Sequence, residues 1–359
     1  MKAHLYAFFT LLIVSIAGCG PSFLADTTLM NAHIAQFEGD SLYYVYGHVA
    51  VRDGKILSIT PFEEGQNDIP SAIDTVDLQG AYLYPGFIDA HAHFLGQGLA
   101  MNSVNLWGAT SWSECVERVQ IFIAEHPDAE VIRGRGWDQN DWPGAAYPTA
   151  NELEGLTDKP IVLSRIDGHA VVANRVALER SGITGNSRIE GGEVLLDAQG
   201  QPSGVLIDNA ESLLQIAQPG EEERIEALLA SQARCYSLGL TSVHDAGLPT
   251  EDIDLIHRLQ QDGQLTIPLY VMVSESPEAL LEWKARGPLK TERLDVHSFK
   301  FYSDGALGSR GALLRQPYHD RHDHFGLQIR SYAYMQDAAK EVAAMGWQMN
   351  THAIGDSAN

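Results

Sequence analysis

The chain has 359 residues, of which 45% are hydrophobic and 20% are charged, and its formal net charge is −23. This composition is typical of a globular protein that is large enough for one barrel or for two domains. The acidic excess argues against nucleic acid as a partner, because phosphate binding requires basic patches. It does not by itself favour a cationic substrate, since an acidic surface commonly serves solubility.

The first residues read as a secretory signal peptide over residues 1–18. Lys2 precedes an apolar run, residues 5–16, that is too short to span a bilayer as a helix. The run ends in Ile-Ala-Gly-Cys19, which resembles the lipobox of bacterial lipoproteins, where the cysteine is acylated and becomes the mature N-terminus. A plain signal peptide cut nearby is the alternative. We expect a lipoprotein anchored through Cys19 to a membrane of the bacterial cell envelope, facing the periplasm or the exterior.

Residues 25–84 are predicted to form part of a small β-sandwich domain. Within them, residues 47–59 contain two β-rich runs around Asp53-Gly54. This dipeptide is favoured in tight hairpin turns because it tolerates positive φ.

The first candidate functional residues lie in the stretch Tyr84-Pro-Gly-Phe-Ile-Asp-Ala-His-Ala-His93. Side chains alternate along a strand, so His91 and His93 project from the same face and can reach one metal ion. A strand that ends in polar groups fits the mouth of an α/β barrel, where catalytic residues lie at the carboxyl ends of strands. A surface histidine pair in a turn is the alternative.

Residues 95–239 show no regular alternation of strands and helices. A connection of this length is far longer than an ordinary βα unit needs. We therefore predict a large α+β insertion that follows barrel strand 1 and covers the mouth. Cys115 and Cys235 are interpreted as buried thiols, and a disulfide between them is left open.

Strands and helices alternate regularly after residue 239. The predicted strands cover residues 240–245, 267–273, 296–302 and 347–352, with helical stretches between them. Such alternation indicates a parallel sheet, either a barrel or a doubly wound fold. The lack of a glycine-rich phosphate loop disfavours the nucleotide-binding fold.

Two of these strands place polar residues on the face that should point inward. Lys300 shares its face with Ser298 and Tyr302, and an unpaired ammonium in an interior is strongly disfavoured. An edge strand with a solvated lysine is the alternative for Lys300. His352 ends the last strand on its inward face, and a satisfied buried imidazole is the alternative there.

Four motifs together resemble the amidohydrolase superfamily, specifically its amidohydrolase-3 branch. They are Pro-Gly-Phe-Ile-Asp-Ala-His-Ala-His93, Asp-Gly-His-Ala-Val-Val-Ala-Asn174, Phe-Lys-Phe-Tyr-Ser-Asp-Gly-Ala-Leu-Gly-Ser-Arg310 and Thr-His-Ala-Ile-Gly-Asp356. The resemblance implies a (β/α)8 TIM-barrel metal-dependent hydrolase with a β-sandwich built from both ends of the chain. Residues 85–359 then supply about five of the eight barrel strands, so we expect an incomplete barrel and a chain that is truncated at its C-terminal end.

The resemblance also implies roles for individual residues. His91, His93 and His352 match metal ligands, and Lys300 is similar to the lysine that is carboxylated to bridge two metals. One or two divalent ions are implied, with Zn²⁺ expected. No residue matches the general base of the family, so Asp245 and Asp304 are only weak candidates near strand ends.

Four further residues are predicted to line the substrate side of the site. They are His169, Trp137, Asp138 and Trp142. Packing within a lid is the alternative for both tryptophans.

The implied reaction is hydrolysis of amide-type C–N bonds in small N-acyl or N-formyl molecules by metal-activated water. One alternative is a non-catalytic surface lipoprotein that binds a small ligand. Another is a hydrolase of esters or lactones that uses the same metal site. The expected partner is a small-molecule substrate, and the oligomeric state is left open.

Overall fold

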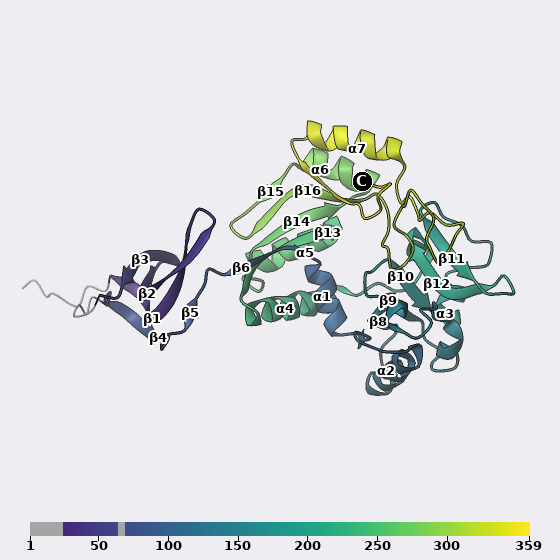
Figure 1. The fold of residues 1–359 in the computed structure, drawn as a ribbon, viewed down its shortest axis with the longest axis horizontal. Coiled ribbons are helices and arrows are strands. Elements are labelled where there is room, and N and C mark those ends of the chain that lie inside the picture. The colour runs from purple at the N-terminus through teal and green to yellow at the C-terminus, as the bar shows by residue number, and fades with distance from the viewer. Residues whose placement is uncertain (1–23, 64–68) are drawn as a thin grey trace, which may run out of the picture. The chain divides into compact units, whose positions relative to one another are not determined.

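The computed structural model describes residues 24–63 and 69–359. The predicted signal peptide and Cys19 lie outside these residues. The chain divides into two compact units, with the boundary between Pro85 and Gly86, and Figure 1 shows both. Within the described ranges, every helix is too short or too polar to cross a bilayer.

The first unit is one sheet with the strand order β3-β2-β1-β4, and β5 pairs with β1 beside β4. Its strands are β1 (Ala25–Glu38), β2 (Ser41–Arg52), β3 (Lys55–Pro61), β4 (Ala72–Asp77) and β5 (Tyr82–Leu83). Asp53 and Gly54 have φ angles of 50° and 71° and join β2 to β3, as a tight hairpin requires. The expected sandwich needs a second sheet, which the described residues of this unit do not form, so the sandwich stays a prediction.

The second unit contains the predicted parallel sheet, in the order β6-β13-β14-β16-β17. Its strands are β6 (Phe87–Ala92), β13 (Leu240–Leu248), β14 (Leu269–Ser274), β16 (Leu294–Tyr302) and β17 (Gln348–His352), with the short β15 (Leu289–Lys290) antiparallel to β16. The connections between these strands contain α1 (Phe94–Met101), α4 (Glu221–Ser237), α5 (Thr250–Gln261), α6 (Pro277–Arg286) and α7 (Tyr332–Ala344). In the described part of the chain the five parallel strands form an open half-barrel.

The helices cover the outer face of the half-barrel. Phe299 and Phe301 of β16 are fully buried in one apolar cluster with Trp283 of α6 and Val342 of α7, and Figure 1 shows α6 and α7 alongside β14 and β16. Because side chains alternate along β16, the one residue between these two phenylalanines points to the opposite, inner face. This packing sets the orientation of Lys300.

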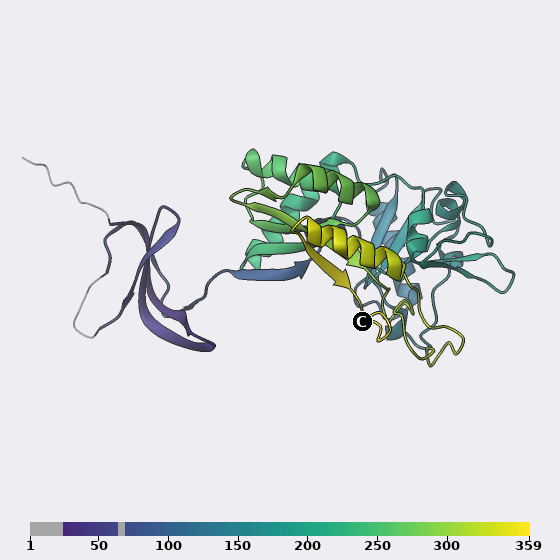
Figure 2. The same cartoon turned by 90° about the horizontal axis from the view of Figure 1, so that it is seen from above.

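A second sheet of six strands has the order β11-β12-β10-β9-β8-β7. Its elements are β7 (Val104–Asn105), α2 (Trp112–Glu125), β8 (Ile132–Trp137), β9 (Ile161–Arg165), β10 (Ala170–Ala173), α3 (Arg175–Arg180), β11 (Gly192–Leu196) and β12 (Pro202–Asp208). It lies beside the half-barrel in both views (Figures 1 and 2). This sheet is the expected insertion, which is narrower than residues 95–239. Leu95 of α1 and Leu228 of α4 lie in that range but pack in the core of the half-barrel instead.

Cys115 and Cys235 are both free and buried. Cys115 packs in the core of the insertion sheet, whereas Cys235 packs in the core of the half-barrel. Burial raises the pKa of the Cys115 thiol to about 12. The interpretation of the two cysteines as buried thiols is therefore confirmed.

Candidate active site

One cavity of about 740 Å³ lies at the carboxyl ends of the parallel strands. The half-barrel contributes His91, His93, Asp245, Lys300 and His352 to its lining. The carboxyl ends of parallel strands meet at one edge of a sheet, so residues that are far apart in sequence come together there. The structure therefore brings together the four side chains that the sequence predicts as metal ligands.

His91 and His93 come from the end of β6, which is the edge strand of the half-barrel. Their ring centroids are 6.0 Å apart, and the rings are nearly perpendicular. Desolvation by the surrounding protein, followed by the charges of Lys300 and His91, lowers the pKa of His93 to about 4. His93 is therefore a neutral imidazole at neutral pH, which is the form that can donate an electron pair to a metal.

Lys300 is only 4% exposed, and none of the described residues forms an ion pair with it. Its stem lies against Gly247, where an added Cβ would be 3.4 Å from the Cβ and Cγ of Lys300. Its ammonium lies 5.0 Å from the centroid of the Tyr302 ring. Burial lowers the pKa of Lys300, and the neighbouring charge of Asp245 opposes this shift. The solvated-edge alternative is therefore wrong, because Lys300 is buried in an interior strand.

Asp245, at the end of β13, is fully buried. Its Oδ2 accepts a 2.7 Å hydrogen bond from the backbone N–H of Phe94, whereas its Oδ1 has no hydrogen-bond partner. Burial raises the pKa of Asp245 to about 7, although the backbone N–H groups oppose the shift. An orphaned, buried carboxylate oxygen that lines a cavity is available to a bound group.

Asp304 does not line this cavity, so its placement does not support its candidacy as a general base. Its carboxylate accepts hydrogen bonds from the backbone N–H groups of Leu313, Ile354 and Gly355, at 2.7 to 2.9 Å. Asp304 is fully buried. These three hydrogen bonds satisfy its carboxylate and hold two loops together.

His352 and His169 face each other in the cavity, with their ring centroids 4.7 Å apart. Burial lowers the pKa of His352, and a hydrogen bond with the carbonyl oxygen of Gly305 opposes the shift. His169 follows β9 in the insertion sheet, and its Nδ1 lies 2.7 Å from Oδ1 of Asp208. The predicted placement of His169 on the substrate side therefore agrees with the cavity lining.

Asp208 is a functional candidate that sequence reasoning missed. It ends β12 with the unusual backbone angles φ 51° and ψ −125°. Such strain in a non-glycine residue persists only where the surrounding structure enforces it. A Cβ at Gly305 or Gly311 would lie 2.2 or 2.1 Å from Oδ2 of Asp208. Glycine is therefore required at both positions for the Asp208 carboxylate to lie so close to their backbone.

Trp137, Asp138 and Trp142 do not line this cavity, so their placement does not support the predicted role in substrate binding. The Trp137 indole N–H donates to the carbonyl of Leu163 at 2.7 Å, and that of Trp142 donates to Ala109 at 2.9 Å. Both indoles pack in the core of the insertion sheet. This packing agrees with the alternative in which both tryptophans have a structural role.

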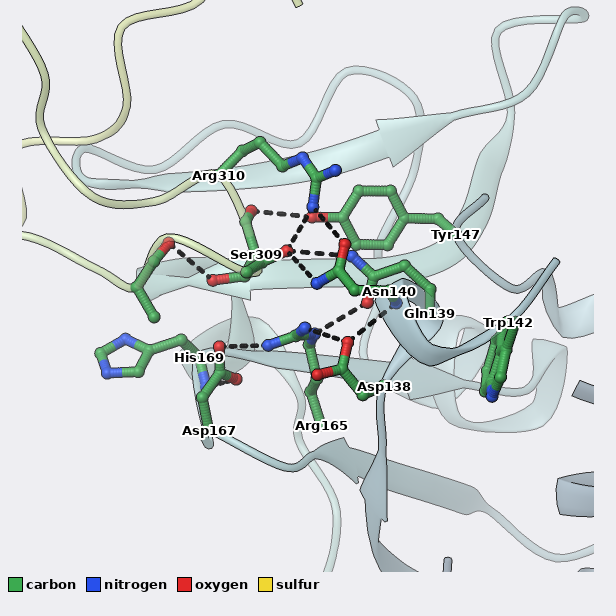
Figure 3. Close-up of polar contacts among 12 residues, drawn as sticks. Asp138, Gln139, Asn140, Trp142, Tyr147, Arg165, Asp167, His169, Ser309 and Arg310 are labelled. Carbon is green, nitrogen blue, oxygen red and sulfur yellow. Dashed lines mark hydrogen bonds and ion pairs between the residues drawn. The ribbon is translucent and has the colours of Figure 1, made fainter. Parts of the chain in front are cut away.

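Asp138 belongs to an ion-pair cluster around the buried Arg165. The Arg165 guanidinium pairs with Asp138 and Asp167, and Asp167 accepts a 3.1 Å bond from the backbone N–H of His169. Figure 3 shows His169 and Trp142 on opposite sides of this cluster. Through Asp167, Arg165 thus holds the turn that places His169 in the lining of the cavity.

The lining residues fit a divalent metal in their donor chemistry. Imidazole is a common zinc ligand, and Asp245 adds a buried carboxylate oxygen without a partner. In residues 24–63 and 69–359, however, no three His, Cys, Asp or Glu side chains are gathered closely enough to hold an ion. The donors share one cavity without forming a compact cluster.

An open parallel half-barrel whose strand ends place histidines and a buried lysine in one cavity has the architecture of a TIM-barrel-like metal-dependent hydrolase. The model of the amidohydrolase family, in its amidohydrolase-3 form, matches residues 74–359. The chain belongs to the amidohydrolase family, which confirms the resemblance seen in its motifs.

Three proteins show how far the similarity extends. YtcJ of Bacillus subtilis is 30% identical over 331 residues, which cover 89% of this chain and 61% of YtcJ. The N-substituted formamide deformylase of Arthrobacter pascens is 24% identical, with 93% of this chain and 64% of the relative covered. The crystal structure of an uncharacterized metal-dependent hydrolase from Pyrococcus horikoshii is 25% identical with a TM-score of 0.67, and 92% of this chain and 66% of that chain are covered. This chain therefore spans less than two thirds of the length of each.

Proposed function

We propose that this protein is a metal-dependent hydrolase that cleaves amide-type C–N bonds in small N-acyl or N-formyl compounds. The observation that carries the proposal is the shared cavity of His91, His93, Lys300 and His352 at the carboxyl ends of β6, β16 and β17. Membership of the amidohydrolase family supports it. The similarity to an N-substituted formamide deformylase supports the choice of substrate class.

The four cavity residues would hold one or two divalent ions, and Zn²⁺ suits their imidazole donors. A bound Zn²⁺ lowers the pKa of water to about 7 and polarises a carbonyl group. The environment of His93 and His352 favours their neutral forms, because their pKa values are lowered. The same environment favours the neutral amine of Lys300, which is the form that can react with CO₂.

The insertion sheet supplies the opposite wall of the cavity. Asp208 engages Nδ1 of His169, so Nε2 is the nitrogen that His169 can offer to a substrate. Arg165 holds the His169 turn through Asp167. These residues orient the substrate against the strand ends, and the cavity of about 740 Å³ has the size of a small-molecule site.

The test combines metal content with turnover by the purified protein. Elemental analysis should find a divalent metal in about equimolar amount or more, and N-formyl and N-acyl compounds should be hydrolysed. Turnover of esters or lactones alone would favour the second enzyme alternative. Ligand binding without any turnover or bound metal would favour the non-catalytic lipoprotein and contradict the proposal.

We also propose that the protein is attached to the cell envelope through a lipid on Cys19. The support is the apolar run of residues 5–16 followed by the lipobox-like Ile-Ala-Gly-Cys19. The attached acyl chains would retain the protein at the membrane surface.

A further inference from the structure

Arg135 of β8 is a charged group that the proposed reaction does not yet use. It lines the cavity of about 740 Å³ and also a neighbouring cavity of about 910 Å³. Its guanidinium donates one long hydrogen bond of 3.3 Å to the carbonyl of Ile166. It forms no ion pair with any residue in the described ranges. An arginine with free donors at the junction of two cavities can bind a ligand.

The backbone beside Arg135 is shaped to let the guanidinium approach. Gly168 has a φ of +74°, and a Cβ there would lie 3.0 Å from Nη2 of Arg135. Only glycine adopts this conformation readily and leaves room for the guanidinium. Arg135 therefore lies against the turn that carries His169, on the insertion side of the cavity.

Four of the five carboxyl groups that line the cavity are engaged by other residues. Asp167 pairs with Arg165, Asp208 with His169, and Glu275 with Arg330. Asp245 accepts the backbone N–H of Phe94.

Glu211 is the remaining cavity carboxyl near Arg135. Its Oε1 is buried without a hydrogen-bond partner. Burial raises the pKa of Glu211 well above its usual value, and the charge of Arg135 opposes this shift. Burial therefore disfavours the charged form of Glu211, and no ion pair joins Glu211 to the guanidinium of Arg135 in the described ranges.

We propose that Arg135 binds an anionic group of the substrate, so that the site selects small N-acyl or N-formyl compounds that carry a carboxylate. The proposal rests on the proposed function and deepens it. A guanidinium presents paired N–H donors that match the two oxygens of a carboxylate. The position of Arg135 beside Gly168 holds the carboxylate on the insertion wall, and the scissile bond then faces the strand ends.

The first experiment measures binding by the metal-free, full-length chain, so that no metal can capture the probe. Benzoate is compared with benzamide, its neutral analogue, by NMR titration. The wild type should bind benzoate more tightly than benzamide. Arg135→Gln should remove this preference, with benzoate binding weakened on the order of tenfold or more. Arg135→Lys keeps the positive charge but lacks the paired N–H donors of a guanidinium. This variant should retain part of the preference for benzoate over benzamide.

Arg234→Gln is the matched control. Arg234 lines only the neighbouring cavity, and none of the described residues pairs with it. The same charge is removed by this substitution, so the preference for benzoate should persist. Equal losses in Arg234→Gln and Arg135→Gln would overturn the proposal, and so would a preference that survives in Arg135→Gln or is absent from the wild type.

The second experiment separates this proposal from the proposed function. N-formylglycine and N-formylglycinamide differ only in the carboxylate, and Arg135→Gln should raise KM for the first by about tenfold or more while the kcat of both is retained. Hydrolysis of both compounds without dependence on Arg135 would overturn the anion site and leave the hydrolase. A benzoate preference that depends on Arg135, without any hydrolysis by the wild type, would overturn the hydrolase and support the anion site.

Discussion

The buried carboxylate of Asp245 accepts a 2.7 Å hydrogen bond from the backbone N–H of Phe94. This bond joins the end of β13 to the start of α1, one residue after His93. The pKa of Asp245 is raised to about 7 from an ordinary value of 3.8, chiefly by burial. The folded protein therefore prefers the protonated carboxyl, whereas the unfolded chain ionises it at lower pH.

This difference predicts a pH dependence of stability in the metal-free protein. Between about pH 4 and pH 7 the folded state binds more protons than the unfolded state, so the free energy of unfolding should fall as pH rises. The steepest slope is about 1.4 kcal/mol per pH unit. Asp245→Asn cannot ionise and should lack this contribution. Urea denaturation at several pH values measures the difference, and parallel pH profiles for the two proteins would contradict the prediction.

Gly305→Ala should displace Asp208 and impair the site. The added Cβ would lie 2.2 Å from Oδ2 of Asp208, and neither group can move freely because both are packed. We expect a destabilisation of about 1–3 kcal/mol and loss of the His169 hydrogen bond. Gly220→Ala is the control, because a Cβ at Gly220 meets no atom within 4 Å. Denaturation together with the NMR signal of the His169 ring checks this, and equal behaviour of both variants would refute it.

The placement of the predicted ligands followed from the sequence for a simple reason. Period-two alternation fixed the faces of His91 and His93, of Lys300 and of His352, and parallel strands bring their carboxyl ends together. The alternation of side chains along a strand is a local property, so a single sequence is sufficient to predict which residues share a face. Their role as metal ligands stays a prediction.

Other parts of the site depend on contacts between distant segments. Asp208 reaches His169 because the glycines of residues 305–311, about a hundred residues later, leave room for its carboxylate. The sequence could not place Trp137 and Trp142, because an aromatic side chain in a core and one in a lid have the same sequence pattern. The hydrogen bonds of Asp304 could not be predicted either, because its backbone partners belong to loops whose paths no sequence pattern fixes.

Cys19→Ser should release the protein from the membrane into the soluble periplasmic fraction. The attached acyl chains supply the retention, and a serine cannot be acylated by the same thioether chemistry. Fractionation of cells followed by immunoblotting measures the distribution. The lipoprotein proposal fails if the variant stays membrane-bound and is processed like the wild type.

His91→Ala should remove most of the bound metal. The strand end then offers only His93 as an imidazole, and a zinc ligand must approach to about 2.0–2.1 Å. Elemental analysis of the purified variant measures the loss. His126→Ala is a suitable control, because His126 lies at the end of α2 outside the cavity. Unchanged metal content in His91→Ala would favour the surface-pair alternative for this motif.

Lys300→Ala should lose both metal and activity. Lys300 is 4% exposed, and burial lowers its pKa, which favours the neutral amine that can react with CO₂. Addition of CO₂ to that amine, with release of a proton, gives a carbamate whose two oxygens can bridge two metals. Short carboxylates added with excess Zn²⁺ should fill the space left in Lys300→Ala and restore part of both properties.

Lys300→Arg separates this role from a structural one. A guanidinium remains cationic and cannot form the carbamate, so we expect this variant to lose metal and activity despite its similar size. A lysine that serves only packing predicts the opposite, namely a modest change in stability and an intact metal site in both variants. Elemental analysis and thermal unfolding of the two variants distinguish these outcomes. Full metal occupancy in Lys300→Arg would eliminate the bridging role, because an arginine can offer the cavity neither a neutral amine nor an anionic oxygen.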